Sequence, residues 1–233
     1  MLKNQKKIIS VLLCLIICIS FSGCSEKKVS STEFALNTVV TLTVYGKNAD
    51  KAMQAAFGEI KRIESLLSAY VETSEVFKIN KNAHLAPVEV SDETVFVLKK
   101  ALEMSEKTDG AFDITVKPLV DLWNIKSENP SVPSDADIDK TKKLVNYKDV
   151  VIDGNKVSFK KEGMQIDLGG AAKGYCADKA VEVLKSYGIK NALLDLGGNI
   201  FALGKSDIIF AAITREANIT WTLVQISLAE RRI

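Results

Sequence analysis

The sequence feature that most constrains the fold is the stretch from Ile166 to Asp178, in which an apolar segment passes through two glycines into an amphipathic pattern. Apolar residues then recur at steps of three and four, namely Cys176, Ala180, Val183, Leu184 and Tyr187. Gly188 follows where a left-handed helix cap is expected. The pattern predicts a short strand, a turn at Gly169 and Gly170, and a helix that begins near the glycines.

The start of this helix has the chemistry of an anion-binding site. First-turn N–H groups lack partners within the helix, the helix dipole adds partial positive charge, and glycines let a ligand approach the backbone. Lys173 opposes the dipole there, so a nearby anion explains it better than helix stability does. Asp167 is placed to hold a metal or a ligand hydroxyl. The alternative is a tight turn in which Asp167 caps the helix and Lys173 is solvated, and the spacing alone does not separate the two.

The first 24 residues are typical of a lipoprotein export signal. Three lysines precede an apolar run that is too short to favour a spanning helix, and a lipobox-like sequence follows: Lys3, Lys6 and Lys7, residues 8–19, and Phe21-Ser22-Gly23-Cys24. We expect a signal peptide over residues 1–23, a lipid such as palmitate on Cys24, and a polar tether over residues 24–32. The domain would then be lipid-anchored at the extracytoplasmic face of the cell membrane. An uncleaved anchor or an ordinary signal peptide is the alternative.

Charge and cysteine content exclude some classes. The formal charge of +2 belongs to the precursor; without the three signal lysines it becomes −1, which does not indicate nucleic-acid binding. Cys14 and Cys18 leave with the signal and Cys24 carries lipid, so Cys176 is alone and no intramolecular disulfide is expected. We interpret Cys176 as a small buried hydrophobic residue.

The rest of the chain mixes strand and helix patterns without regular βαβ alternation, which predicts an α+β fold. In the first half of the chain we expect a strand over residues 33–45 with a bend at Asn37, a helix over 49–69, an irregular segment over 74–82 and a helix from a Ser91 cap to about 107. In the second half we expect a short helix with Pro118 in its first turn, and a loop over 129–137 with a helix from Ser134 to about 144. A hairpin of 150–153 and 157–159 and a strand over 192–195 complete the expected elements. The residues expected to face inward from the second long helix are Val95, Leu98, Leu102 and Met104. We interpret Phe112 and Trp123 as core residues, and His84 as solvated.

Five blocks of the chain occur in the order seen in the ApbE family, which the chain therefore resembles. They are Leu36-Asn37-Thr38; Leu67-Ser68-Ala69-Tyr70; Gly110-Ala111-Phe112-Asp113-Ile114-Thr115 with Pro118-Leu119 and Leu122-Trp123; Asp167 to Tyr175; and Leu196-Gly197-Gly198-Asn199-Ile200. The resemblance covers roughly residues 34–204. It implies an ApbE-like, T-fold-related mixed sheet with packed helices.

The resemblance also implies an activity, that of an FAD:protein FMN transferase. Such an enzyme depends on Mg²⁺ and transfers FMN from FAD to a threonine hydroxyl of a target flavoprotein outside the cytoplasm, releasing AMP. Carried over by position, the FAD site would comprise Leu36, where the family more often has Met, with Thr38, Ser68, Ala69, Tyr70, Ala111, Phe112, Asp113, Asp167 and Lys173. Gly170 would offer its backbone carbonyl to the metal. No residue is assigned as catalytic.

The resemblance stops before the end of the chain. Family members continue past the position of Gly204 with a stretch whose Asp and Thr or Ser residues bind the metal, whereas residues 207–233 read like an out-of-frame tail. We therefore expect a partial ApbE-like domain over residues 33–206, truncated or frameshifted, incomplete at its C-terminus and impaired in activity. The alternatives are a non-catalytic FAD-binding lipoprotein and an ordinary solute-binding lipoprotein.

Overall fold

The structure is a computed structural model and describes residues 27–125 and 130–204. The elements in chain order are β1 (Lys28–Ala35), β2 (Thr38–Tyr45), α2 (Ala49–Leu67), α3 (Glu75–Asn82), β3 (Val88–Glu89), α4 (Asp92–Lys107), the 3₁₀ helix η1 (Ile114–Val116), α5 (Lys117–Trp123), α6 (Asp135–Lys142), the 3₁₀ helix η2 (Tyr147–Asp149), β4 (Val150–Asp153), β5 (Lys156–Phe159), α7 (Gly169–Ser186), β6 (Asn191–Leu196) and β7 (Asn199–Leu203). This mixture of antiparallel sheets and packed helices is the predicted α+β class.

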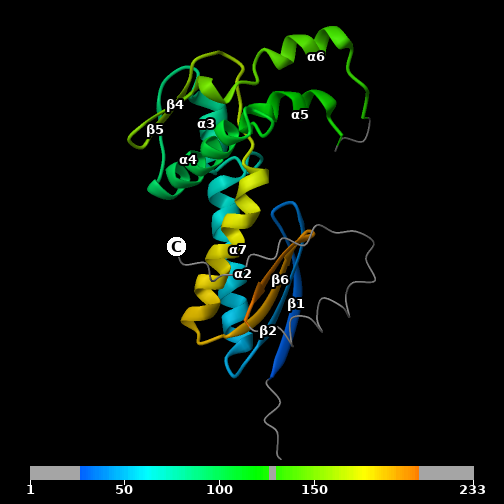
Figure 1. The fold of residues 1–233 in the computed structure, drawn as a ribbon, viewed down its shortest axis with the longest axis vertical. Coiled ribbons are helices and arrows are strands. Elements are labelled where there is room, and N and C mark those ends of the chain that lie inside the picture. Colours follow the sequence, from blue (N-terminus) through cyan, green and yellow to red (C-terminus); the bar gives the residue numbers. More distant parts are fainter. Residues whose placement is uncertain (1–26, 126–129, 205–233) are drawn as a thin grey trace, which may run out of the picture.

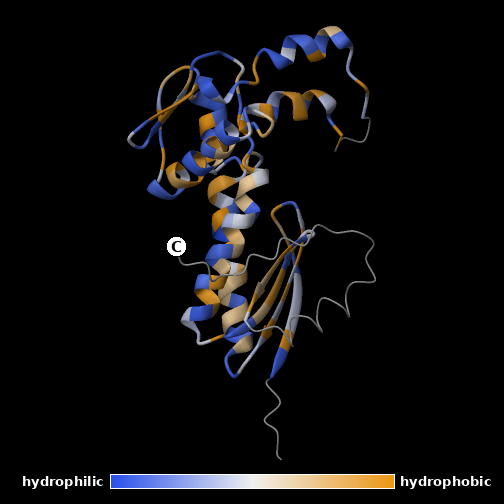
Figure 2. Cartoon of the chain, viewed as in Figure 1, coloured by the Kyte–Doolittle hydropathy of each residue, from blue (hydrophilic) through white to orange (hydrophobic). Residues whose placement is uncertain are grey.

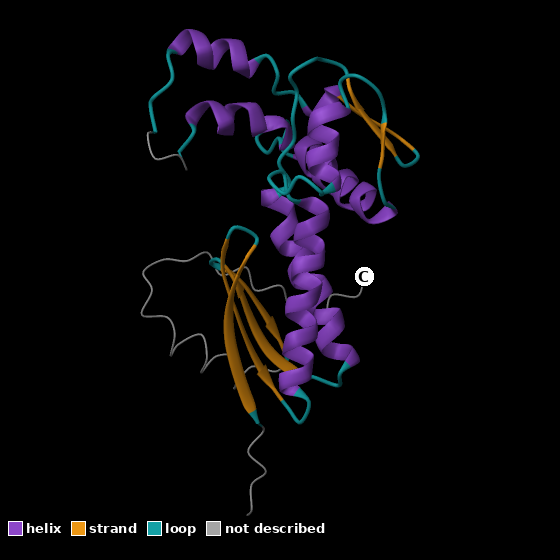
Figure 3. Ribbon diagram, turned by 180° about the vertical axis from the view of Figure 1, so that it is seen from behind, coloured by secondary structure: helices purple, strands orange, loops and turns teal. Residues whose placement is uncertain are grey.

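A four-stranded antiparallel sheet of order β1-β2-β6-β7 forms one layer, and α2 and α7 lie side by side against it (Figures 1 and 3). The sequence favours this layer because β1 and β2 mix apolar residues with serines and threonines, while β6 and β7 are mostly apolar. Figure 2 shows hydrophobic residues along much of the sheet. Leu42 and Val44 of β2 pair with Leu194 and Ala192 of β6, and all four are buried. The main core therefore lies between the sheet and the two long helices.

The strand predicted over residues 33–45 is in fact a hairpin. β1 and β2 pair antiparallel along their whole length, and Leu36 and Asn37 form the turn between them with φ values of 55° and 56°. Asparagine tolerates this left-handed conformation but leucine adopts it rarely. Of the two turn residues, only Asn37 is therefore typical of a two-residue hairpin turn. The predicted tether over residues 24–32 is likewise wrong from Lys28 onward, because residues 28–32 pair with β2.

The predicted helix after the glycines is present as α7, and its C-terminal cap is confirmed. Gly188 has φ 78° and donates its N–H to the Lys185 carbonyl, while the Ile189 N–H reaches the Leu184 carbonyl. The predicted strand before the glycines is absent. Ile166 is held instead by the Asn80 side chain, which exchanges two hydrogen bonds with its backbone at 2.7 and 2.9 Å.

A second group of elements, α3 to β5, lies beyond one end of the α2 and α7 pair (Figure 1). Here the Ser91 cap of α4, the Pro118 start of α5 and the β4–β5 hairpin are confirmed. The segment predicted to be irregular is helix α3, capped by Ser74. Met104 is 49% exposed rather than inward, because it lies off the buried stripe of α4.

Three sequence predictions concern residues outside the described ranges. They are the signal peptide over residues 1–23, the lipidation site Cys24 and the tail at 207–233. Within residues 27–125 and 130–204, none of the helices combines the length and the apolar character that crossing a membrane requires.

Candidate functional site

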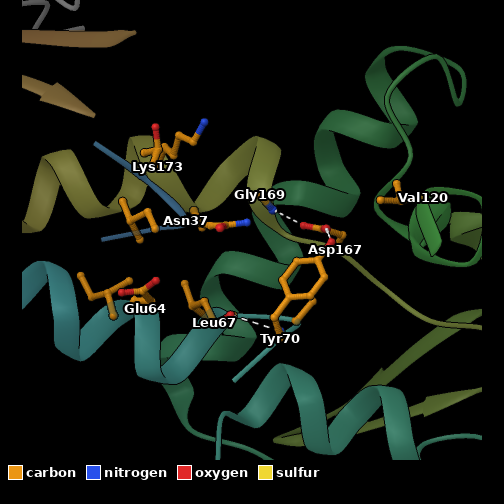
Figure 4. Close-up of a pocket in the computed structure, with 14 residues that line it drawn as sticks. Asn37, Glu64, Leu67, Tyr70, Val120, Asp167, Gly169 and Lys173 are labelled. Carbon is orange, nitrogen blue, oxygen red and sulfur yellow. Dashed lines mark hydrogen bonds between the residues drawn. The ribbon is translucent and has the colours of Figure 1, made fainter. Parts of the chain in front are cut away.

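A cavity of about 390 Å³ opens where the C-terminal end of α2, the start of α7, the β1–β2 turn and α5 meet (Figure 4). Its volume is within the usual range for small-molecule sites. The residues that line it are Leu36, Asn37, Thr38, Ile63, Glu64, Leu67, Ser68, Ala69, Tyr70, Val120, Asp167, Gly169, Ala172 and Lys173. Seven of them belong to the ten residues that the family resemblance assigned to an FAD site. The fold thus brings together four segments that are far apart in the sequence.

The turn that ends α2 forms one wall. The Ser68 hydroxyl accepts a hydrogen bond from the Tyr70 N–H at 3.2 Å, and the Ser74 hydroxyl donates to the Ser68 carbonyl at 2.5 Å. These bonds fix the backbone, while the Tyr70 side chain remains 49% exposed at the cavity. The sequence therefore presents an aromatic ring on a rigid turn.

Asp167 and the start of α7 form the opposite wall. Asp167 Oδ1 accepts the Gly169 N–H at 2.7 Å, and the Tyr70 hydroxyl donates to Asp167 Oδ2 over a long 3.4 Å. Partial burial, together with the negative charge of Asp167, raises the pKa of the Tyr70 hydroxyl above its ordinary value. Tyr70 therefore stays a neutral hydrogen-bond donor at neutral pH.

The prediction that the first-turn amides of α7 are bare is wrong for three of them. The Gly169 N–H is bound by Asp167, and the N–H groups of Ala171 and Ala172 both reach the Leu168 carbonyl, at 2.9 and 2.7 Å. Asp167 thus binds the first amide of the helix, as the alternative stated, whereas Lys173 lines the cavity instead of standing in open solvent. Consequently, the positive charge that α7 offers a ligand comes mainly from the Lys173 side chain, which lies in the cavity wall.

The β6–β7 turn packs closely against Thr38, which lines the cavity. That turn consists of Gly197 and Gly198, both with positive φ, and a Cβ added at Gly197 would lie 2.6 Å from Thr38 Cγ2 and overlap its hydroxyl. Gly198 is further held by its N–H, which donates to Asp195 Oδ1 at 2.7 Å. Glycine at 197 thus lets the turn approach Thr38 closely.

The structure does not bring Ala111 or Asp113 to the cavity wall. Asp113 instead caps η1 and braces a neighbouring turn: its Oδ1 accepts the Thr115 N–H at 2.7 Å and its Oδ2 accepts the Tyr147 N–H at 2.9 Å. Phe112 packs behind the start of α7, since a Cβ at Gly170 would come within 2.8 Å of its ring. Phe112 therefore supports the start of α7, whereas Asp113 supports η1 and the turn at Tyr147. Contact of Ala111, Phe112 or Asp113 with FAD remains a prediction.

Several cavity residues were missed by the sequence reasoning. Glu64 is the main one, a half-buried carboxylate on α2 that faces the cavity together with Asn37 and Val120 (Figure 4). Glu64 could have been found from its position four residues before Ser68, because residues four apart lie on the same face of a helix. Trp123, expected in the core, is 38% exposed because it ends the short outer helix α5.

Cys176 was correctly predicted as a buried residue. Its side chain is fully buried in α7, and burial raises the pKa of the thiol to about 12. The carboxylates of Glu64 and Glu59 act in the same direction. This thiol is therefore protonated at neutral pH and does not serve as a nucleophile.

The described residues do not by themselves fit a magnesium site. Among residues 27–125 and 130–204, no three or more His, Cys, Asp or Glu side chains are grouped closely enough to hold a metal. Gly170 could supply a carbonyl and Asp167 a carboxylate, but Mg²⁺ prefers octahedral oxygen ligation and Asp167 already bonds Gly169.

Comparisons with known proteins identify the family. The model of the ApbE family matches residues 36–223, a range that includes part of the tail predicted to be unrelated. The chain is 32% identical over 209 residues to an FAD:protein FMN transferase of Treponema pallidum, covering 84% of this chain and 58% of the relative. It is 35% identical over 184 residues to one of Klebsiella pneumoniae, covering 78% and 58%.

Solved structures agree with the sequence relatives. The ApbE protein of Thermotoga maritima superposes with a TM-score of 0.72 at 36% identity, over 77% of this chain and 60% of that one. The flavin transferase ApbE of Vibrio cholerae gives a TM-score of 0.72 at 26% identity, over 78% and 60%. The chain thus spans less than two thirds of the length of these relatives. By its sequence and its fold, it belongs to the ApbE family.

Proposed function

We propose that this chain is the FAD-binding part of an FAD:protein FMN transferase. The observation that carries the proposal is the cavity, which gathers seven of the ten residues assigned from the family resemblance. The relatives of Treponema pallidum and Klebsiella pneumoniae bear this activity in their names. Because the chain spans only part of their length, its own activity is a proposal.

The transfer is a phosphoryl-group reaction. A threonine oxygen of the acceptor attacks the phosphorus on the FMN side of the FAD diphosphate, and a new P–O bond forms. The bond from that phosphorus to the bridging oxygen breaks, AMP leaves with the bridging oxygen, and the threonine proton is released. Such reactions need charge neutralisation and alignment more than covalent help from the protein.

The residues of the cavity can supply both needs. Lys173 brings a positive charge to the wall beside the start of α7, where it would attract the diphosphate. Tyr70 presents a ring against which a flavin or adenine plane can stack, and its turn is fixed by Ser68. Asp167 holds the start of α7 in place. No described residue is assigned as the base that accepts the threonine proton.

Two finer parts of the proposal concern the metal and the membrane. Mg²⁺ dependence is proposed from the family resemblance, with the Gly170 carbonyl as one ligand, and no step is assigned to the metal here. Lipid anchoring through Cys24 outside the cytoplasmic membrane is proposed from the lipobox-like sequence. Labelling of cells with radioactive palmitate tests it: wild type should carry the label and Cys24→Ser should not.

FAD binding is tested with the mature chain carrying Cys24→Ser, by quenching of flavin fluorescence. We expect saturable binding that Lys173→Gln weakens by about tenfold, or about 1.4 kcal/mol. Lys185→Gln is the matched control, because it removes the same charge from the exposed last turn of α7. Equal affinity of both variants and wild type would place the diphosphate elsewhere.

Transfer is tested by adding Mg²⁺, FAD and an acceptor protein that presents a threonine, with a Thr-to-Ala acceptor as control. A fluorescent acceptor band and an equal amount of AMP support the transferase. Binding of FAD without either product would instead favour the alternative, a non-catalytic FAD-binding lipoprotein.

A further inference from the structure

Lys117 is a buried charge that the proposed function does not use. It opens α5 and is 6% exposed, although lysines are almost never buried without a partner. Its ammonium group donates to both carboxylate oxygens of Asp121 at 2.5 and 2.6 Å. The half-exposed Asp121 therefore compensates a charge that the fold has taken out of water.

Helix stability does not explain this arrangement. In an i,i+4 pair the favourable order places the acidic residue first, toward the positive end of the helix dipole. Here the lysine is at the N-terminal end of α5 and the aspartate is near its C-terminal end, which is the reverse order. The burial of Lys117 thus points to a contact outside its own helix.

That contact is the ring of Tyr70. The ammonium nitrogen of Lys117 lies 4.7 Å from the ring centroid, within the range of a cation–π interaction. The Tyr70 hydroxyl meets Asp167 across the cavity. Lys117 therefore contacts one face of the Tyr70 ring, and Asp167 binds its hydroxyl. These two contacts hold the ring in place although about half of the residue is exposed.

We propose that Lys117, fixed by Asp121, is a positioning residue that holds the Tyr70 ring as a flat wall for the planar ring system of a flavin dinucleotide. The ligand part of this inference rests on the proposed function, whereas the positioning of Tyr70 does not. A ring fixed before binding loses less conformational freedom when the ligand stacks on it, and this gain appears as affinity.

The test compares Lys117→Met with a matched control elsewhere in the chain. Lys117→Met keeps the apolar stem and removes the charge, and Lys117→Arg keeps a cation that can stack on the ring. Lys179→Met is the control, because Lys179 also pairs with a carboxylate on its own helix, Glu182, and lies 5.7 Å from the ring centroid of Tyr175, outside the cavity.

The first measurement follows the ring itself, without any ligand. With 3-fluorotyrosine incorporated and the Tyr70 signal assigned through Tyr70→Phe, ¹⁹F NMR should show the Tyr70 resonance shifted in Lys117→Met and restored toward wild type in Lys117→Arg. Lys179→Met should leave it unchanged. An unaltered Tyr70 resonance in Lys117→Met would overturn the inference.

The second measurement is FAD affinity by fluorescence quenching. Lys117→Met should weaken it by roughly 3- to 30-fold, with recovery in Lys117→Arg and no change in Lys179→Met. If wild type binds FAD and Lys117→Met binds it equally well, the positioning role in binding is refuted. If wild type binds no FAD, the proposed function fails along with the ligand part, and the NMR result alone decides whether Lys117 positions Tyr70.

Discussion

Replacing Gly197 by alanine should damage the fold and the cavity together. The residue has φ 65°, where an L side chain costs about 1–2 kcal/mol. The added Cβ would also lie 2.6 Å from Thr38 Cγ2 and 2.9 Å from its Cβ, closer than real Cβ contacts allow. Overpacking of this kind typically costs about 1–3 kcal/mol more. We therefore expect Gly197→Ala to lower the free energy of unfolding by about 2–5 kcal/mol.

Gly154→Ala is the matched control for the cost of placing an L side chain at a positive φ. Gly154 also occupies a hairpin turn with positive φ, 56°, but a Cβ there meets nothing within 4 Å. Its loss should be about 1–2 kcal/mol, so the difference between the two variants isolates the clash with Thr38. Urea denaturation of the mature chain with Cys24→Ser, followed by circular dichroism, gives both values.

A double-mutant cycle assigns the difference to its cause. Thr38→Gly removes all three atoms that the new Cβ would meet, so Gly197→Ala should cost about 1–3 kcal/mol less in that background. In an otherwise wild-type chain, Gly197→Ala should also weaken FAD binding, because Thr38 lines the cavity. Equal losses for Gly197→Ala and Gly154→Ala, within about 0.5 kcal/mol, would refute the close approach of the turn to Thr38.

Three further predictions use charges and a thiol. Raising the ionic strength should weaken FAD binding by wild type more than by Lys173→Gln, because the attraction between Lys173 and the diphosphate is screened; parallel salt dependences in fluorescence titrations would contradict this. Cys176 should react with a thiol reagent at pH 8 only as fast as the chain unfolds, since burial raises its pKa to about 12, and rapid labelling of the folded chain would disprove that burial. Arg62 of α2 donates two hydrogen bonds of 2.8 Å to the Glu93 carboxylate of α4, and these lower the pKa of Glu93. The contribution of this pair to stability is therefore present above the ordinary pKa of 4.5 and is lost as the pH falls through the folded pKa. The gap in unfolding free energy between wild type and Glu93→Gln, measured by urea denaturation, should therefore shrink in acid, and a gap that does not change with pH would count against the pair.

Local signals explain what could be predicted of the fold. Ser91 and Pro118 start helices, and Gly188 ends one. Each effect depends only on residues a few positions away in the sequence, so it could be predicted from the sequence. The hairpin turn at Leu36 and Asn37 could not be predicted in the same way. A left-handed leucine is tolerated only because the paired strands on both sides impose it.

The segment before α7 shows the other limit of sequence reasoning. Its apolar pattern predicted a strand, yet the partners of Ile166 and Asp167 are the Asn80 side chain and the Ile114 carbonyl, both far away in the sequence. Residues of the candidate site could be named from the family resemblance. Whether each one lines the cavity, like Tyr70, or braces it from behind, like Asp113, depends on such long-range contacts.

The correction at α7 changes which forces should govern recognition. A cradle of backbone amides would bind a diphosphate through short hydrogen bonds whose directions the helix fixes. Asp167 accepts the hydrogen bond of the Gly169 N–H instead. Its negative charge therefore lies at the N-terminal end of α7, where an anionic ligand would otherwise bind. Attraction must then come from Lys173 against the opposing charges of Asp167 and Glu64 in the same cavity. Neutralising Glu64 with Gln should therefore strengthen FAD binding while Lys173→Gln weakens it, and a weakening by both would mean that Glu64 accepts a hydrogen bond from the ligand.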